Sequence, residues 1–184
     1  MARQFVHLHV HTEYSLLDGA IRCGQLAEKA ALYGMPAVAM TDHGAMYGAV
    51  EFYDACKKQG INPIIGCEVY VDPEGHTSRE RRGKNHHLIL LAENDEGYHN
   101  LVKLSSIAYT DGFYGKPRID HDLLSKYSRG LIASSACIAG EIPSSSSRGR
   151  RRRPFAGQSS TGISWAKTTS FSRLCITGSP NRPW

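Results

Sequence analysis

Residues 5–18 read FVHLHVHTEYSLLD, and this stretch decides how the chain is interpreted. His7, His9 and His11 stand at every second position, with valine and leucine between them. Successive side chains of a β-strand point to opposite faces, so a strand over residues 5–11 would present three imidazoles on one face and three aliphatic side chains on the other. The pattern predicts a strand with an apolar back and a front that can bind metal.

Length and composition exclude several classes of protein. A chain of 184 residues can bury one core, as one domain or part of one. No N-terminal stretch resembles a signal peptide, and no apolar run approaches the roughly 20 residues of a membrane span, so we expect a cytoplasmic protein without a membrane partner. The cysteines are odd in number and show no C-x-x-C spacing, which argues against a disulfide framework: Cys23, Cys56, Cys67, Cys137 and Cys175.

The net charge of +5 belongs to the end of the chain. From Ser144 to Trp184 there are eight lysines or arginines and no acidic residue. The preceding 143 residues hold 14 basic and 17 acidic residues, which is a slightly acidic balance. The overall charge is therefore no sign of a nucleic-acid-binding surface in the first 143 residues.

Hydrophobic patterns predict an alternation of strands and helices. Gly34 and Gly60 are placed to end two of the helices. The alternation favours an α/β fold with a parallel sheet, open or closed into a barrel, in which functional residues gather at the C-terminal ends of strands. The expected strands are 5–11, 37–41, 63–71, 86–92 and 130–135, and the expected helices are 24–33, 46–59 and 95–108.

Side chains that can bind metal fall at these strand ends, and each has an ordinary structural alternative. A single His-x-His pair in a strand is as often part of a hydrogen-bonded core as of a metal site. Three histidines on one face favour a metal, because burying several imidazoles without partners is costly. The tetrapeptide TDHG, which contains Asp42 and His43, could equally close a strand with a turn.

Glu68 is the hardest of the candidates to explain structurally, because a carboxylate inside the apolar strand 63–71 needs a partner or a metal. Only one of His86 and His87 can face the site, since neighbours in a strand point to opposite sides. A cysteine such as Cys137 more often packs as a small apolar side chain, and only its place beyond a strand end supports a ligand role.

Together these residues resemble the PHP (polymerase and histidinol phosphatase) family, and most closely the PHP domains at the N-terminus of bacterial DNA polymerase III alpha subunits, which replicate DNA. The resemblance runs from about Phe5 to Pro143. It rests on FVHLHVHTEYSLLDGA, AVAMTDHGAMYGAVEFY, NPIIGCEVYV, HHLILLAENDEGYHNLVKLSSIAY, GFYGKPRID and GLIASSACIAGEIP. Metal binding does not require GFYGKPRID or ENDEGYHNLVKL, so these segments favour the polymerases over a histidinol phosphatase.

The resemblance implies a distorted seven-stranded β/α barrel that binds up to three divalent metal ions, with zinc or manganese expected. It also implies phosphoester hydrolysis, in which metal ions lower the pKa of bound water and neutralise charge on the phosphoryl oxygens. In the polymerases it implies either a metal-dependent 3′–5′ exonuclease or a structural remnant, with DNA and the other polymerase subunits as partners. The implied metal ligands are His9, His11, Asp18, His43, Glu68, His87 and Cys137; Glu68 and His43 are also assigned catalytic roles, and His7 and Asp42 supporting ones.

One family motif is missing from the matched segment. An Asp-x-His pair completes the site in the family, and neither this pair nor the magnesium-binding palm of a polymerase follows Pro143. We therefore expect the barrel to be incomplete, with strand 130–135 an unpaired edge. On this interpretation the chain neither polymerises DNA nor hydrolyses phosphoesters efficiently.

The segment after Pro143 suggests a shifted reading frame. Serine codons of the type TCN, read one nucleotide earlier, encode leucine, valine, isoleucine or phenylalanine, and AGG or CGG arginine codons become glutamate. One back-translation of residues 168–182 encodes NFFLEALHHGIPEQ in that frame, which resembles the continuation of the polymerases. We interpret 144–184 as a frameshifted, disordered tail, and the run Arg150–Arg153 as an accident of codons.

Three other interpretations remain open. The tail could be an arginine-rich arm that binds RNA or DNA. The chain could be a free-standing PHP phosphatase acting on a metabolite. It could also be a non-catalytic interaction module, which its metal content would distinguish from both enzymes.

Overall fold

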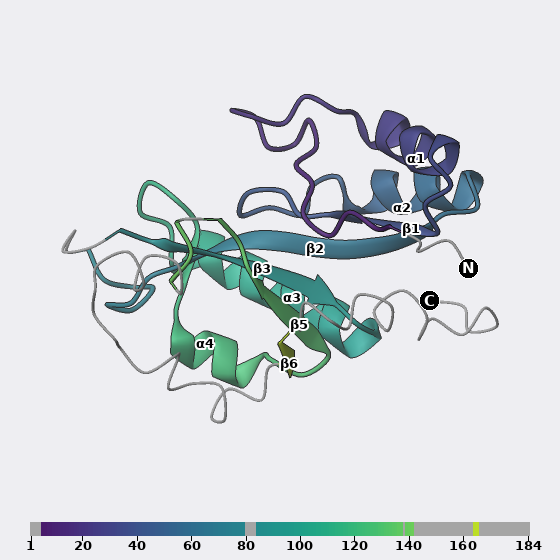
Figure 1. The fold of residues 1–184 in the computed structure, drawn as a ribbon. Helices are drawn as coiled ribbons and strands as arrows, with labels where there is room; N and C mark the ends of the chain where they lie inside the picture. Colours follow the sequence, from purple (N-terminus) through teal and green to yellow (C-terminus); the bar gives the residue numbers. More distant parts are fainter. Residues whose placement is uncertain (1–4, 80–83, 138, 142–163, 166–184) are drawn as a thin grey trace, which may run out of the picture.

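The computed structural model describes residues 5–79, 84–137, 139–141 and 164–165, which form a mixed β-sheet with helices packed along it (Figure 1). The α/β class predicted from the sequence is confirmed. The helices are α1 (Cys23–Leu32), α2 (Ala49–Lys58), α3 (Asp95–Thr110) and α4 (His121–Lys126). The strands are β1 (Ala37–Met40), β2 (Asn62–Val71), β3 (His86–Ala92), β4 (Arg118–Ile119), β5 (Leu131–Ser135) and β6 (Ser164–Trp165).

The sheet has the strand order β1-β2-β3-β5-β6, and β4 pairs with β2 as well. The pairs β1/β2, β2/β4 and β5/β6 are parallel, whereas β3 is antiparallel to both β2 and β5. The prediction of a parallel sheet is therefore wrong at β3. Parallel neighbours need a long crossover, usually a helix, and the described part of the loop between β2 and β3 contains none.

The predicted strand over 5–11 is an extended segment beside β1 rather than a regular strand. The Ala39 N–H donates to the His7 carbonyl, and the Thr41 N–H donates to the Val10 carbonyl, both at 2.9 Å. Between these two hydrogen bonds the 5–11 segment advances by three residues and the chain at β1 by only two, so the two segments do not form a regular ladder of hydrogen bonds. The segment still runs along the sheet and carries its histidines to the site.

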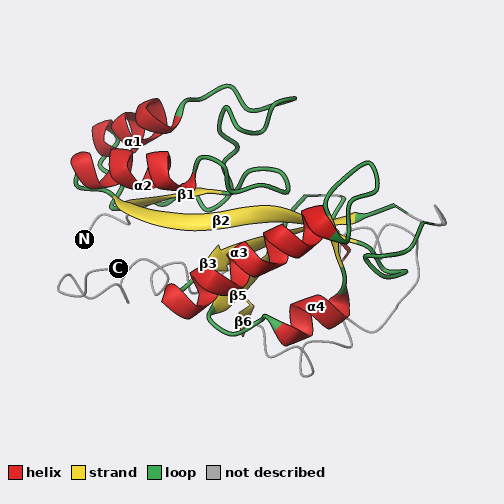
Figure 2. Ribbon diagram, turned by 180° about the vertical axis from the view of Figure 1, so that it is seen from behind, coloured by secondary structure: helices red, strands yellow, loops and turns green. Residues whose placement is uncertain are grey.

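Alternation along β2 separates two faces of the sheet. Cys67 and Val69 pack in the core cluster that contains α3, which covers β3 when the molecule is seen from behind (Figure 2). The opposite face, called the inner face below, holds a second apolar cluster that includes Ile64 of β2 and Ile89 of β3. Glu68 has the same parity as Ile64 and therefore points to the inner face.

The apolar residues of 5–11 do not share one cluster. Val6 and Leu8 pack with the inner-face cluster, whereas Val10 packs beside α1 and α2. The predicted single apolar back is therefore divided between two parts of the core. The positive φ angles of Gly34 (65°) and Gly60 (69°) follow α1 and α2, as expected for glycines that end helices.

The far edge of the sheet differs from the expectation. β6 pairs with β5, with Ser164 opposite Ile132 and Trp165 opposite Ala133, so the prediction of an unpaired edge at 130–135 is wrong. The rest of the predicted tail lies outside the described residues, so its disorder and its frameshift stay predictions. No helix in the described ranges combines the length and the apolar character needed to cross a bilayer.

Candidate metal centre

Strand pairing places Glu68 between two histidines. The Gly44 N–H donates to the Glu68 carbonyl at 2.9 Å, in a parallel bridge that sets His43 directly opposite Glu68. On the other side of β2, His87 of β3 lies opposite Tyr70, and it is thus the diagonal neighbour of Glu68 on the inner face. Because β3 is antiparallel to β2, the first residues of β3 lie at the same edge of the sheet as the C-terminal end of β1.

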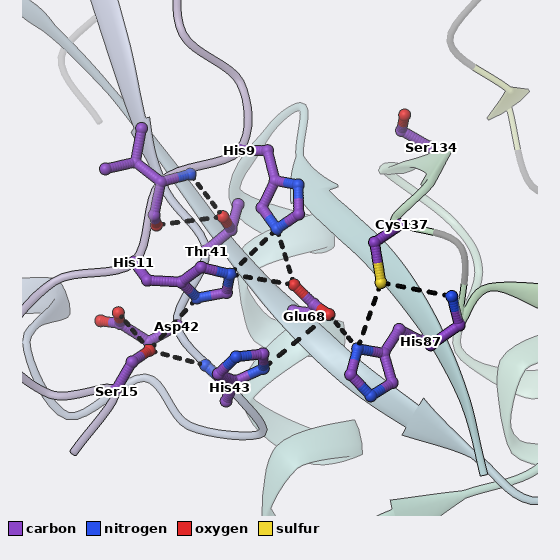
Figure 3. A network of polar contacts seen from close by, with 12 residues as sticks. His9, His11, Ser15, Thr41, Asp42, His43, Glu68, His87, Ser134 and Cys137 are labelled. Carbon is purple, nitrogen blue, oxygen red and sulfur yellow. Dashed lines mark hydrogen bonds and ion pairs between the residues drawn. The ribbon is translucent and has the colours of Figure 1, made fainter. Parts of the chain in front are cut away.

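Four imidazoles converge on the Glu68 carboxylate, which is only 1% exposed (Figure 3). Its Oε2 lies 2.6 Å from His9 Nε2 and 3.1 Å from His11 Nε2. Its Oε1 contacts His87 Nδ1 and lies 3.8 Å from His43 Nδ1. The prediction that one member of the His86–His87 pair faces the site is confirmed for His87.

The surrounding histidines govern the ionisation of Glu68. Burial opposes the charged carboxylate, but hydrogen bonds with His11 and His9 outweigh burial and lower the Glu68 pKa. The same hydrogen bond to Glu68 raises the pKa of His11. Burial instead lowers the pKa of His87 against the attraction of Glu68, and the Lys116 ammonium adds to that lowering. Glu68 is therefore an anion at neutral pH.

The donor set fits a divalent cation better than it fits protons. Nε2 of His9 lies 3.0 Å from Nε2 of His11, and both nitrogens lie near one carboxylate oxygen. A carboxylate only accepts hydrogen bonds, so both nitrogens must carry a proton to satisfy it, and the two protons then face each other. In addition, His43 Nδ1 is buried and has no hydrogen-bond partner among the residues that the structure describes. Imidazole and carboxylate donors suit zinc and related metals.

Three overlapping groups could each hold an ion, with ligand atoms within 4.8 Å of one another in each group. His11, His43 and Glu68 each belong to two of the groups, so the groups form one continuous cluster rather than separate sites. The groups are His9–His11–Glu68, His11–Asp18–His43 and His43–Glu68–His87. The structure thus brings together six of the seven ligands that the family resemblance implies, while their roles as ligands stay predictions.

Three of the candidate residues lie at the border of the cluster or outside it. Asp18 is 54% exposed and joins through its Oδ2, 3.0 Å from His43 Nε2. Cys137 Sγ lies 3.8 Å from His87 Nδ1 but belongs to none of the three groups. His7 is also outside them, and its ring packs edge-on against Phe5 at 4.7 Å.

Asp42 organises the loop that carries the first histidines. Its buried carboxylate accepts the Thr12 N–H at 2.5 Å, the Thr12 hydroxyl at 2.6 Å and the Ser15 hydroxyl at 2.8 Å. Ser15 Oγ accepts the His43 N–H at 3.1 Å and lies 3.2 Å from His11 Nδ1. Partners of this kind orient metal-binding histidines. Asp42 therefore acts on the cluster through Ser15.

Four residues around the cluster were not predicted from the sequence. Thr12 directly follows His11 in HTEYS and Ser15 stands four positions after it, and hydroxyls close to a candidate ligand in the sequence were the available signal. Tyr70 lies two positions after Glu68, so strand alternation already placed it on the same face. Lys116 gave no local signal, because only tertiary packing brings it near.

Comparisons with known proteins identify the family of this chain. The sequence matches the PHP domain family over residues 7–171. It is 51% identical over 148 residues to the DNA polymerase III subunit alpha of Aquifex aeolicus, covering 76% of this chain and 13% of that protein. The same subunit of Helicobacter pylori is 51% identical over 140 residues, covering 76% and 12%. The chain thus spans a small part of the length of these relatives.

Among solved structures, an amidohydrolase from Chromobacterium violaceum is 26% identical, with a TM-score of 0.42, and the match covers 56% of this chain and 33% of that one. A TM-score of this size leaves the family assignment to rest on the sequence matches.

Proposed function

This chain belongs to the PHP domain family, and we propose that its histidine–carboxylate cluster binds divalent metal ions and, in the whole protein, hydrolyses phosphoester bonds in DNA, within the N-terminal region of a bacterial replicative DNA polymerase. The observation that carries the proposal is the contact of His9, His11 and Glu68, in which two imidazole nitrogens and one carboxylate oxygen meet within 3.1 Å. Protons cannot satisfy all three contacts, whereas one cation can.

The residues of the cluster have distinct tasks in this proposal. Glu68, which stays ionised, offers one oxygen to the His9 and His11 side and the other to the His43 and His87 side, as a bridging ligand would. Bound divalent ions would supply a water of lowered pKa and would neutralise charge on the phosphoryl oxygens. Zinc or manganese suits these donors, and magnesium, which prefers oxygen ligands, suits them less.

The link to DNA replication rests on the relatives. The two alpha subunits named above are 51% identical to this chain, and we infer from them that DNA and other polymerase subunits are the partners of the whole protein. The free-standing metabolite phosphatase and the interaction module are less well supported, because the matched relatives are polymerase subunits.

Metal content is the first test. The purified chain is dialysed against zinc or manganese, and bound metal is counted by mass spectrometry for the wild type, Glu68→Gln, His87→Gln and His86→Gln. His86 is the matched control, because it is the neighbouring histidine on the other face of β3. We expect bound metal in the wild type and in His86→Gln, and loss of at least one ion in the other two. Equal metal content in all four would contradict the proposal.

Hydrolysis is tested separately on single-stranded DNA labelled at its 5′ end, with a version of the protein whose reading frame is restored after codon 143, because the chain as it stands is expected to be a poor enzyme. Metal-dependent shortening from the 3′ end that is lost in Glu68→Gln would support the nuclease. A metal-loaded protein without turnover would instead support the structural role.

We further propose that residues from about Ser144 onward are a shifted reading of the same gene, which is why this chain is expected to be a poor enzyme. The gene is resequenced around codon 143, and turnover is compared between the chain as it stands and a version with the frame restored. If no one-nucleotide shift opens a long polymerase-like frame, or if both versions turn over equally, this proposal is wrong.

A further inference from the structure

Lys116 stands beside the metal cluster without belonging to it. Its Nζ lies 4.3 Å from the centre of the Tyr70 ring. That ring is stacked on His43 with centres 6.1 Å apart, and it meets His87 edge-on at 5.1 Å. The charge of Lys116 also acts on His87. The ammonium group and two of the candidate ligands therefore pack around one aromatic ring.

The fold fixes the loop that carries Lys116. Arg118, at the end of this loop, is buried and pairs with Asp72 at 2.5 Å, and it donates to the Gly112 carbonyl at 2.9 Å. At the other side the loop rests on Gly44, the residue after His43. A Cβ atom at Gly44 would lie 2.7 Å from Pro117 Cγ, so the backbone at Gly44 is in close contact with the proline ring. The position of Lys116 relative to the cluster is therefore set by packing.

The ammonium of Lys116 is available to a ligand. The side chain is exposed, and within the described part of the chain it forms no ion pair with a carboxylate. A cation held over an aromatic face at an exposed site is attracted to the ring weakly, which orients a flexible stem but leaves the protons of the ammonium free. A positive charge beside a metal centre raises the local concentration of anions.

We propose that Lys116, oriented by Tyr70, binds a non-bridging oxygen of the phosphoryl group that enters the metal cluster. The inference rests on the proposed function and adds a substrate-binding residue to it. The lysine holds the phosphoryl group at the cluster by direct contact, and it takes no part in bond breaking. One charge-assisted hydrogen bond at an exposed site corresponds to about a tenfold change in affinity.

The test measures phosphate binding rather than turnover. The full chain is loaded with stoichiometric zinc and titrated with inorganic phosphate by calorimetry, for the wild type, Lys116→Ala, Lys116→Arg and Tyr70→Leu. The matched control is Lys103→Ala. Lys103 also sits over a tyrosine ring, at 5.7 Å from the centre of Tyr127, but it belongs to α3, on the other face of the sheet.

We expect about tenfold weaker phosphate binding by Lys116→Ala, a smaller loss by Lys116→Arg and Tyr70→Leu, and wild-type affinity for Lys103→Ala. Zinc content should be the same in the wild type and in both Lys116 variants. Wild-type phosphate affinity in Lys116→Ala would overturn the inference, and so would an equal loss of phosphate and zinc, which would indicate a structural role. Absence of zinc from the wild type, seen before phosphate is added, would instead refute the proposed function and this inference with it.

Discussion

Removal of the Asp42 carboxylate should both destabilise the chain and weaken metal binding. Asp42 is fully buried and accepts three hydrogen bonds, two from Thr12 and one from Ser15. In Asp42→Ala the buried Thr12 N–H loses its acceptor, at a cost of about 1–3 kcal/mol, and two hydroxyls lose a charged partner. Since the variant no longer has to desolvate a carboxylate, we expect a net loss of about 3 kcal/mol in the free energy of unfolding.

The conservative variant separates charge from geometry. Asp42→Asn keeps an acceptor for the Thr12 N–H and should lose only about 1 kcal/mol. The control is Asp54→Ala, an exposed aspartate of α2, which should stay within about 0.5 kcal/mol of the wild type. Urea unfolding of the metal-free chain, followed by circular dichroism, measures all three. Zinc affinity is then measured by competition with a chromophoric chelator, because Ser15 links Asp42 to His11.

The zinc affinity of Asp42→Ala should fall by about 10- to 100-fold, the usual effect of removing a partner that orients a ligand. A loss of stability below about 0.5 kcal/mol would show that the three hydrogen bonds are replaced by water, and it would refute the reasoning. Unchanged zinc affinity in a destabilised variant would refute the supporting role of Asp42 while leaving its structural role intact.

Three further predictions concern other parts of the fold. Burial opposes the ionised form of Asp120, but hydrogen bonds from His76 outweigh burial and lower the Asp120 pKa. The stability that this ionised form contributes is present above the unfolded pKa of about 3.9 and is lost as the pH falls through the lower folded pKa. The difference in unfolding free energy between the wild type and Asp120→Asn should therefore shrink between pH 6 and pH 3 in urea titrations. Iodoacetamide at pH 8 should modify the exposed Cys137 before the thiols buried in α1 and α2. If Cys137 is a ligand, peptide mass spectrometry should show that zinc protects its thiol from modification, and equal labelling with and without zinc would remove Cys137 from the ligand set. Gly44→Ala should lower thermal stability by several degrees, because φ is +61° and the new Cβ would meet Pro117 Cγ at 2.7 Å; an unchanged melting temperature would contradict the close packing of the loop.

Local periodicity determined much of the fold. A helix or strand that packs on one side repeats its apolar residues at 3.6 or 2 positions, so the boundaries of α1, β1, β2, β3 and β5 follow from the sequence to within one or two residues. The same alternation placed Glu68 among apolar neighbours on one strand face. The resemblance to PHP proteins then identified the cluster that the structure assembles.

Other features depend on contacts that no local pattern encodes. The direction of β3 follows from the form of its connection to β2, and this direction brings His87, at the beginning of its strand, to the edge where β1 ends. The irregular pairing of 5–11 beside β1 depends on the fit between two segments some 30 residues apart.

The same limit applies to the surroundings of the cluster. Asp42 meets Thr12 and Ser15 across 27 to 30 residues of chain, and Lys116 meets Tyr70 across a longer interval. Hydrogen bonds and ring contacts act over a few ångströms in space, whatever the separation along the chain. The sequence therefore determined which residues could form the site, and the tertiary structure decided which groups orient them and where a phosphate would meet a positive charge.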